Sequence, residues 1–107
     1  MKRGDIFLVE IPSVHGYEQS GLRPAIILSE PVANIVIIIP CTSNLESLRF
    51  PSTTLISPNR SNGFKIETVA LVFQLRAVDR KRLIKHIGRL DAISMSEIKK
   101  LIRKMFF

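Results

Sequence analysis

The sequence predicts a mainly β fold with helices (α+β), in which short strands form a small half-open barrel or rolled sheet and one helix ends the chain. Runs rich in β-branched and aromatic residues, which favour strands, recur between residues 5 and 78. Most connections between them are short, which favours antiparallel pairing. Residues 94–107 instead space their apolar side chains as a helix does. A chain of 107 residues suits one domain, spanning 1–107.

Proline, glycine and polar residues separate the expected strands. We expect strands at 5–11, 25–29, 35–39, 53–57, 64–68 and 69–78. Pro12 ends the first strand and Pro40 ends the third, because proline lacks the amide that a strand donates. Residues 13–21 form a polar loop, and residues 58–63 form a turn.

Helical segments are expected in three places. Residues 41–50 and 79–83 each accommodate one helical turn, the second beginning with the N-cap residue Asp79. Residues 84–90 are ambiguous. Near the end of the chain, Ser94 and Glu97 have the spacing of a capping box. An apolar stripe that we expect to face the core follows, formed by Ile98, Leu101, Ile102 and Met105.

The charge of the chain is positive and uneven. The formal net charge is +7, and residues 60–107 hold twelve of the sixteen Lys and Arg residues. Such asymmetry favours a polyanionic partner or an acidic protein, and the alternative is a solvated basic face. Aromatic residues make up 7% of the chain, so extensive base stacking on aromatic platforms is not indicated.

Metal, cofactor and membrane signals are weak. The single cysteine, Cys41, excludes an internal disulfide and a cysteine-based zinc cluster. His15 and His86 are the only histidines and lie far apart in the sequence, so we expect neither metal nor cofactor. No apolar run reaches the about 20 residues of a membrane span, and the N-terminus does not resemble a signal peptide. We therefore expect a cytoplasmic protein without membrane contact.

Side chains that can bind a phosphate group are expected near the start of the strand at 25–29. In the register that the short connection favours, Arg23 lies opposite Cys41 and next to Thr42 and Ser43. A guanidinium binds two phosphate oxygens in a fork, and hydroxyls can donate to the third. The structural alternative is an arginine that caps loop carbonyls beside a Thr–Ser turn. The pattern alone leaves both interpretations open.

Four segments, in order and in spacing, resemble the MazF/PemK (Kid-like) family of bacterial toxins from type II toxin–antitoxin systems. They are Arg3–Val9, Glu18–Ile27, Pro40–Ser43 and Phe73–Leu83. The resemblance covers essentially the whole chain. It implies an SH3-like barrel with a C-terminal helix, usually as a homodimer. It further implies an endoribonuclease (mRNA interferase) that cleaves single-stranded RNA and is neutralised by a cognate antitoxin.

The resemblance also assigns site residues. The family's catalytic arginine falls on Arg23 and its catalytic Thr or Ser falls on Thr42. Gln74 matches a glutamine that approaches the site, whereas Arg76 and Asp79 match positions that are more often structural. The expected substrate contacts are Tyr17, Glu18, Gln19, Ser43 and Gln74.

The chain departs from the Kid pattern. Tyr17 stands where Kid has a histidine, and Leu71 and Phe73 stand where Kid has an arginine and an aspartate. A Kid-like acid–base set is therefore absent, and the Arg–Thr arrangement of other family members is the better model for the mechanism. It needs no metal, because the 2′-hydroxyl of RNA attacks the neighbouring phosphate and leaves a 2′,3′-cyclic phosphate and a 5′-hydroxyl.

The group that removes the proton is not assigned by the sequence. Arginine stays protonated and is a poor general base. His15 and Glu18 are candidates by pKa suitability, and the alternative is that both are ordinary loop residues. His86 is expected to be structural, and Cys41 is expected to be a small buried residue, not a nucleophile.

Two other functions compete with RNA cleavage. CcdB-type toxins, which poison topoisomerase, share this fold, but they act through a C-terminal tryptophan and this chain contains none. A non-catalytic RNA-binding module would keep the basic surface without needing Arg23 in a special role.

Overall fold

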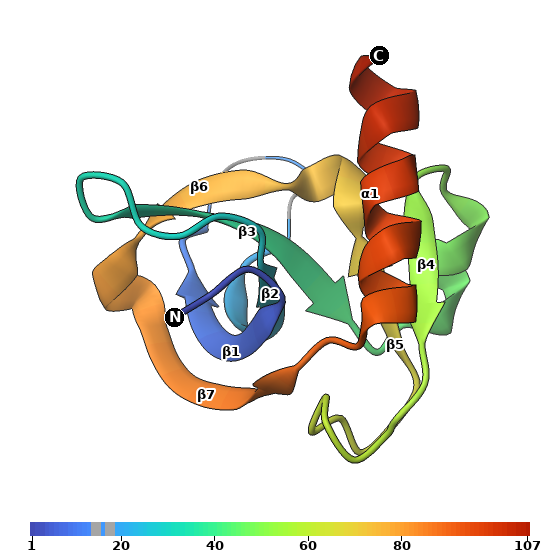
Figure 1. Ribbon diagram of the computed structural model, residues 1–107, viewed down its shortest axis with the longest axis horizontal. Helices are drawn as coiled ribbons and strands as arrows, with labels where there is room; N and C mark the ends of the chain where they lie inside the picture. Colours follow the sequence, from blue (N-terminus) through green and yellow to red (C-terminus); the bar gives the residue numbers. More distant parts are fainter. Residues whose placement is uncertain (14–15, 17–18) are drawn as a thin grey trace.

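The computed structural model describes residues 1–13, 16 and 19–107. Its strands are β1 (Asp5–Ile11), β2 (Gly21–Ile27), β3 (Ile35–Thr42), β4 (Thr53–Ile56), β5 (Thr68–Leu71), β6 (Arg76–Asp79) and β7 (Leu83–Arg89). Its helices are α1 (Ala92–Phe106) and the 3₁₀ turns η1 (Leu45–Arg49), η2 (Val72–Gln74) and η3 (Arg80–Arg82). The mainly β fold with a C-terminal helix is thereby confirmed (Figure 1).

All strand pairs are antiparallel, and β3 is the centre of the sheet. The strand order is β4-β5-β3-β2-β1-β7, and β6 pairs with β3 beside this path. One edge of β3 carries β6 along its first half and β5 along its end. The sheet therefore rolls around β3 without closing, with β4 and β7 at its ends (Figure 1).

The sheet is packed on both faces, which explains the continuous apolar runs of β2 and β3. Successive side chains of a strand point to opposite faces. Ile26 and Ile39 belong to one cluster together with Ile98 of α1, whereas Ala25 and Ile27 belong to a second cluster on the other face. The apolar stripe of α1 covers the first cluster, as the sequence predicts.

The hairpin of β2 and β3 differs from its prediction. β2 begins at Gly21, not at residue 25, because Gly21–Ile26 pair with β1. β3 continues through Pro40 to Thr42, where β5 takes over the pairing. The register is shifted by one residue, so that Ala25 pairs with Pro40. A two-residue turn at Ala33–Asn34, both with positive φ, sets the turn position.

Two further predictions are corrected at the second half of the sheet. Residues 64–67 are not a strand, and β5 begins only at Thr68. The expected strand 69–78 is interrupted by η2, which turns the chain from β5 towards β6. The turns η1 and η3 confirm the expected helical turns, and Asp79 caps η3 by accepting a hydrogen bond from the Lys81 amide.

The helix α1 begins before its predicted cap. Asp91 is the N-cap, and its carboxylate accepts a hydrogen bond from the Ser94 amide at 2.7 Å. Ser94 and Glu97 therefore lie inside the helix, because an aspartate three residues earlier supplies the same capping bond. Among the described residues, no helix has the length and apolar character that crossing a membrane requires.

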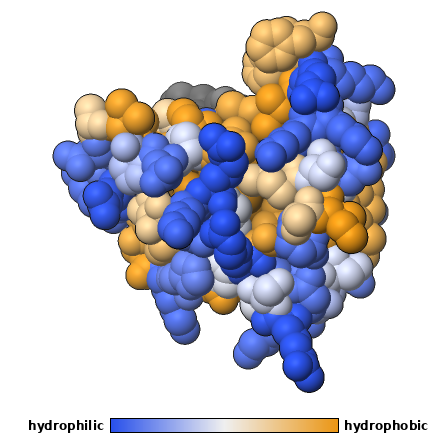
Figure 2. Space-filling view, viewed as in Figure 1, coloured by the Kyte–Doolittle hydropathy of each residue, from blue (hydrophilic) through white to orange (hydrophobic). Residues whose placement is uncertain are grey.

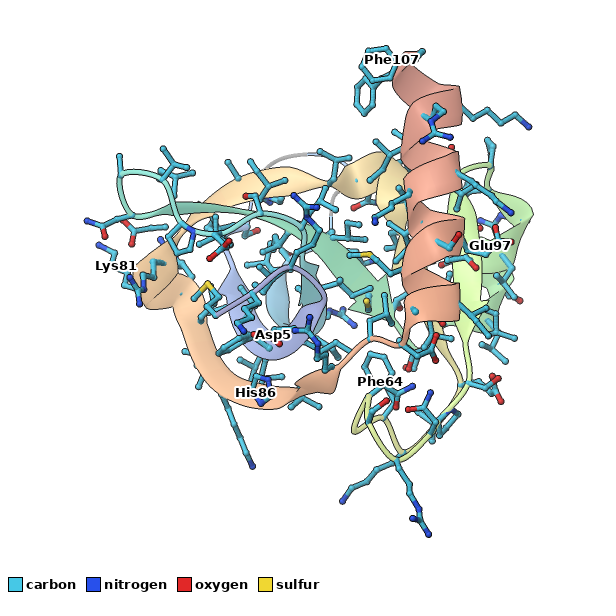
Figure 3. All side chains as sticks on the ribbon, in the orientation of Figure 1. Asp5, Phe64, Lys81, His86, Glu97 and Phe107 are labelled. Carbon is cyan, nitrogen blue, oxygen red and sulfur yellow. The ribbon has the colours of Figure 1, made fainter. Side chains whose placement is uncertain are left out.

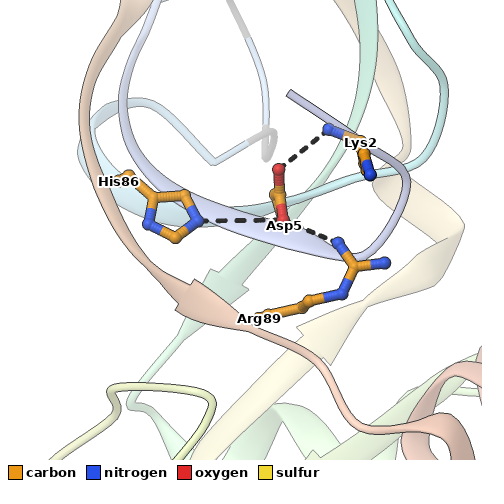
Figure 4. Close-up of polar contacts among 4 residues, drawn as sticks. All are labelled: Lys2, Asp5, His86 and Arg89. Atoms are coloured by element: carbon orange, nitrogen blue, oxygen red, sulfur yellow. Dashed lines mark hydrogen bonds and ion pairs between the residues drawn. The ribbon is translucent and has the colours of Figure 1, made fainter.

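A cluster of charged groups ties β1 to β7 and to the start of the chain. The Asp5 carboxylate accepts hydrogen bonds from the Lys2 amide and from Arg89, each at 2.8 Å (Figure 4). His86 approaches the same carboxylate at 3.7 Å and meets the Phe7 ring edge-on. His86 is thus in a structural contact, as expected from the sequence.

Candidate functional site

Residues from four parts of the chain line a cavity of about 340 Å³, which we call the Arg23 cavity. One wall is the start of β2, with Arg23, and another is the end of β3, with Thr42. The loop between β4 and β5 and one residue of β7 complete it. The lining residues are Leu22, Arg23, Pro24, Cys41, Thr42, Ser43, Gly63, Phe64, Lys65, Ile66, Thr68 and Ile87.

Arg23 lies in the part of β2 that still pairs with β1 but no longer pairs with β3. The pairing of β2 with β3 joins Ala25–Ile27 to Ile38–Pro40, and Pro24 has no amide to extend it. Continuing this register by two residues places Arg23 level with Thr42, not with Cys41 as predicted. The half-buried Arg23 donates its Nε–H to the Ser20 carbonyl at 3.2 Å. The carbonyl-capping role is therefore present, yet the two terminal NH₂ groups are not needed for it.

Thr42 presents a hydroxyl to the same cavity. Thr42 is buried, with 5% of its surface exposed, and its Oγ1 accepts a hydrogen bond from the Asn44 amide at 3.2 Å. A hydroxyl that accepts one hydrogen bond still has its own proton to donate. The structure therefore brings Arg23, Thr42 and Ser43 together, as the sequence predicts.

Cys41 forms part of the cavity wall as an inert thiol. It is fully buried, and burial raises the pKa of the Cys41 thiol to about 12. Only the thiolate is a nucleophile, so Cys41 stays unreactive at neutral pH. The expectation of a small buried residue is confirmed.

Gln19 and Gln74 meet each other and do not line the Arg23 cavity. The Gln74 side-chain oxygen accepts a hydrogen bond from the Gln19 amide at 2.8 Å, which fastens the end of the first loop to η2. Among the described residues, the Gln19 side-chain oxygen is buried without a hydrogen-bond partner. Arg76 donates to the Pro12 carbonyl and so also braces this loop.

Three candidate residues, His15, Tyr17 and Glu18, lie outside the described residues. Within the described part of the chain, no carboxylate lies within ion-pair distance of Arg23. In the same part of the chain, no group of three or more His, Cys, Asp or Glu side chains could hold a metal ion.

The loop of residues 57–67 is a wall of the cavity that the sequence analysis missed. It is the yellow-green segment below α1 in Figure 1, and Figure 3 labels Phe64 within it. Asn62 is fully buried and donates to the Ser57 carbonyl, while its side-chain oxygen accepts from the Phe64 amide. A Cβ on Gly63 would collide with the Ile87 carbonyl, and a Cβ on Gly88 with the Asn62 carbonyl. In the sequence, only the Asn and Gly residues at 59–63 indicate that this loop adopts a fixed conformation.

Comparisons with known proteins agree with this fold. The chain is 29% identical to the endoribonuclease EndoA of Bacillus subtilis (strain 168), over 92% of this chain and 87% of that protein. The crystal structure of MazF from Deinococcus radiodurans superposes with a TM-score of 0.81 at 22% identity, covering 98% of this chain and 94% of that one. A mycobacterial endoribonuclease in complex with its cognate antitoxin gives a TM-score of 0.72 at 15% identity, covering 97% and 92%.

The family assignment rests on the whole chain. Residues 2–106 match the family described as PemK-like, MazF-like toxin of type II toxin–antitoxin system. The match includes every strand, the helix α1 and all described residues of the Arg23 cavity. The chain therefore belongs to the PemK-like, MazF-like family of toxins from type II toxin–antitoxin systems.

Proposed function

We propose that this toxin is an endoribonuclease that cleaves single-stranded RNA without a metal ion. The observation that carries the proposal is the shared cavity of the Arg23 guanidinium and the Thr42 hydroxyl. Together they offer several N–H and O–H donors to one phosphate group, and the relatives named above are endoribonucleases.

The reaction uses a nucleophile that RNA supplies. The 2′-hydroxyl oxygen attacks the adjacent phosphorus and loses its proton, while the bond from phosphorus to the 5′-oxygen breaks and that oxygen gains a proton. The products are a 2′,3′-cyclic phosphate and a 5′-hydroxyl. Arg23 stabilises the negative charge that grows on the phosphoryl oxygens, and Thr42 donates a hydrogen bond to the same group. Ser43, next in the chain, is a second donor.

The proton transfers need groups other than Arg23. A guanidinium remains protonated, so it acts as a charge partner and not as a base. Glu18 and His15 of the first loop remain the candidates for proton transfer. Tyr17, Glu18 and Gln19 are proposed to contact the substrate, with Gln74 holding the end of this loop through the Gln19 amide.

Two partners complete the proposal. The toxin acts as a homodimer, and a cognate antitoxin blocks it by covering the Arg23 cavity or by displacing the first loop. The net charge of +7 supports an acidic inhibitory segment, because opposite charge guides association. The proposed location is the cytoplasm, where RNA and the antitoxin are available.

Poisoning of topoisomerase is not favoured. The sequence contains no tryptophan, the residue through which CcdB-type toxins act. A non-catalytic RNA-binding module would need no preorganised donors around one phosphate, so the joint position of Arg23 and Thr42 favours the enzyme.

The test is to incubate the pure protein with a long unstructured RNA in EDTA and to map the new ends. We expect fragments with 5′-hydroxyl and 2′,3′-cyclic phosphate ends. Intact RNA after long incubation with excess folded protein, both in EDTA and in magnesium, would contradict the enzyme and favour the binding module.

A further inference from the structure

A second cavity continues the Arg23 cavity on the far side of Lys65 and Ile66. It measures about 530 Å³ and is lined by Ser43, Leu45, Pro58, Lys65, Ile66 and Glu67. We call it the Glu67 cavity. Ser43, Lys65 and Ile66 line both cavities, so the Glu67 cavity directly adjoins the Arg23 cavity.

The walls of the Glu67 cavity suit a flat, partly polar ring. Leu45 is 48% exposed and Ile66 is 60% exposed, and with Pro58 they give apolar surface on which a base can pack. The polar end is the half-buried Glu67, whose Oε2 accepts a hydrogen bond from the Ser57 hydroxyl at 2.8 Å. This bond holds the carboxylate in place, and its oxygens retain lone pairs for a ligand.

The loop that carries these groups is anchored before any substrate arrives. Asn59 accepts hydrogen bonds from the Ser61 and Asn62 amides and donates to Asp91, the N-cap of α1. Gly63 and Gly88 allow the loop to touch β7 directly. Because the loop is fixed at both β7 and α1, Lys65 and Glu67 stand at defined positions relative to Arg23.

We propose that the Glu67 cavity binds the base next to the scissile phosphate and that Glu67 selects guanine there. An ionised carboxylate only accepts hydrogen bonds. The Watson–Crick edge of guanine offers two adjacent donors, N1–H and the N2 amino group. Adenine and cytosine place a ring acceptor beside their amino group, and uracil has carbonyls on both sides of its N3–H, so each of them repels one carboxylate oxygen. This inference rests on the proposed function of the Arg23 cavity.

Lys65 completes the subsite between the two cavities. Its ammonium is exposed, and Lys65 forms no ion pair with the described acidic residues. The RNA strand between the phosphate at Arg23 and the base in the Glu67 cavity passes this point, so Lys65 contacts the RNA backbone there. The carboxylate of Glu67 then lies next to a base and not next to a phosphate, which it would repel.

The first experiment measures binding, so that it does not depend on cleavage. Short 2′-O-methyl RNAs of uridine with one central variable nucleotide are titrated against the wild-type protein. We expect the guanosine oligonucleotide to bind about ten- to a hundredfold more tightly than the other three, as for a bidentate base contact. Equal binding of all four, or no binding of any, overturns the inference.

Variants assign the preference to Glu67. Glu67→Gln replaces one acceptor with a donor, so the guanosine preference should fall by about ten- to a hundredfold and binding of the adenosine oligonucleotide should improve. Glu97→Gln, which removes the same charge from the exposed side of α1, should leave the preference unchanged (Figure 3). Circular dichroism confirms that each variant is folded. A folded Glu67→Gln protein with the wild-type preference overturns the inference.

A cleavage assay on a random RNA library separates this inference from the proposed function. Cuts at a fixed step from guanosine that lose this preference in Glu67→Gln support both. Cuts without any guanosine preference leave the proposed function standing and overturn the subsite. Guanosine-selective binding without cleavage supports the subsite and contradicts the enzyme. Lys65→Ala should weaken binding of all four oligonucleotides by a similar factor and leave their order unchanged, and a changed order would contradict its assigned role.

Discussion

Arg23 both caps a loop carbonyl and lines the Arg23 cavity. Its Nε–H caps the Ser20 carbonyl, and its terminal groups belong to the lining of the Arg23 cavity. The capping bond fixes the direction of the guanidinium before a phosphate arrives, which lowers the ordering cost of binding. A structural contact at one nitrogen therefore prepares the proposed phosphate contact at the others.

Removal of this guanidinium should separate activity from stability. We expect Arg23→Ala to lower the cleavage rate by about a hundred- to a thousandfold, as when one preorganised charge donor is lost. Arg3→Ala is the matched control, because Arg3 also donates its Nε–H to a carbonyl, that of Leu28, but lies outside the cavity. Rates on one RNA and urea unfolding of both variants are compared. Near-wild-type cleavage by folded Arg23→Ala would exclude this site.

Sequence reasoning brings Arg23, Thr42 and Ser43 together, as the structure does, but through an incorrect register. Arg23 was expected level with Cys41, whereas the pairing of β2 and β3 places it level with Thr42. The difference of one residue comes from the two-residue turn at Ala33–Asn34, where the non-glycine Ala33 has a positive φ of 49°. An alanine rarely adopts this conformation, so the sequence does not predict the position of the turn.

Asp5 should make stability depend on pH. Partial burial of Asp5 raises the pKa of its carboxyl, but hydrogen bonds from the Lys2 amide and Arg89 outweigh it, and the pKa of Asp5 is lowered. The stabilisation is therefore present above the unfolded pKa and is lost as the pH falls through the folded pKa. We expect Asp5→Asn to lower the free energy of unfolding by about 1.5–3 kcal/mol at pH 7, the range for hydrogen bonds to charged groups.

The control for this measurement is an exposed pair. Glu46→Gln removes the carboxylate that faces Arg49 at 3.7 Å in solvent, and it should change stability by less than about 1 kcal/mol. The difference between Asp5→Asn and wild type should shrink below the unfolded pKa of aspartate, about 4. A difference that stays constant from pH 7 to pH 3 would mean that the Asp5 charge does not contribute.

At the scale of elements, the loop of residues 57–67 is where the sequence was least informative. The sequence predicts a strand at 64–68, but the Asn62 side chain accepts a hydrogen bond from the Phe64 amide within the loop, and Gly63 lies in close backbone contact with Ile87 of β7. Such tertiary contacts override strand propensity. By contrast, β1, η1, η3 and the apolar stripe of α1 were predictable because local pattern and burial agree there.

Filling the contact between this loop and β7 should destabilise the fold. A Cβ at Gly88 would collide with the Asn62 carbonyl, so we expect Gly88→Ala to lower the free energy of unfolding by about 1–3 kcal/mol. Because the loop must move, the guanosine preference should weaken as well. At Gly21 an added Cβ meets no atom within 4 Å, so Gly21→Ala should cost only its left-handed backbone, about 1–2 kcal/mol, with the preference retained. Urea unfolding and oligonucleotide titration measure both effects, and unchanged values for Gly88→Ala would show that the contact is loose.

The whole molecule distributes its positive charge across several elements. Arg82 pairs with Glu10 and Arg89 pairs with Asp5, whereas Lys99, Lys100, Arg103 and Lys104 lie exposed on α1. Figure 2 shows hydrophilic side chains over most of one face and a hydrophobic projection at the C-terminal end of α1. The exposed cations, not the paired ones, are available to a polyanion.

RNA affinity should therefore fall with salt. Each phosphate contact to single-stranded RNA contributes about 0.7 to the slope of log affinity against log salt concentration. With Arg23, Lys65 and at least one further cation in contact, we expect a slope steeper than about −2. Titration of the guanosine oligonucleotide at four salt concentrations measures it. A slope near zero would exclude the basic half of the chain from RNA binding.

The buried thiol of Cys41 has a consequence for the redox behaviour of the protein. Burial raises the pKa of the Cys41 thiol to about 12, so the thiol stays protonated at pH 7, and the sheet covers it. Oxidants and alkylating reagents can therefore reach the Cys41 thiol of the folded toxin only when the end of β3 opens. Since the chain has no other cysteine, the rate of alkylation counts those openings directly. The sole thiol of the chain is thus a built-in probe of how often this wall of the Arg23 cavity opens.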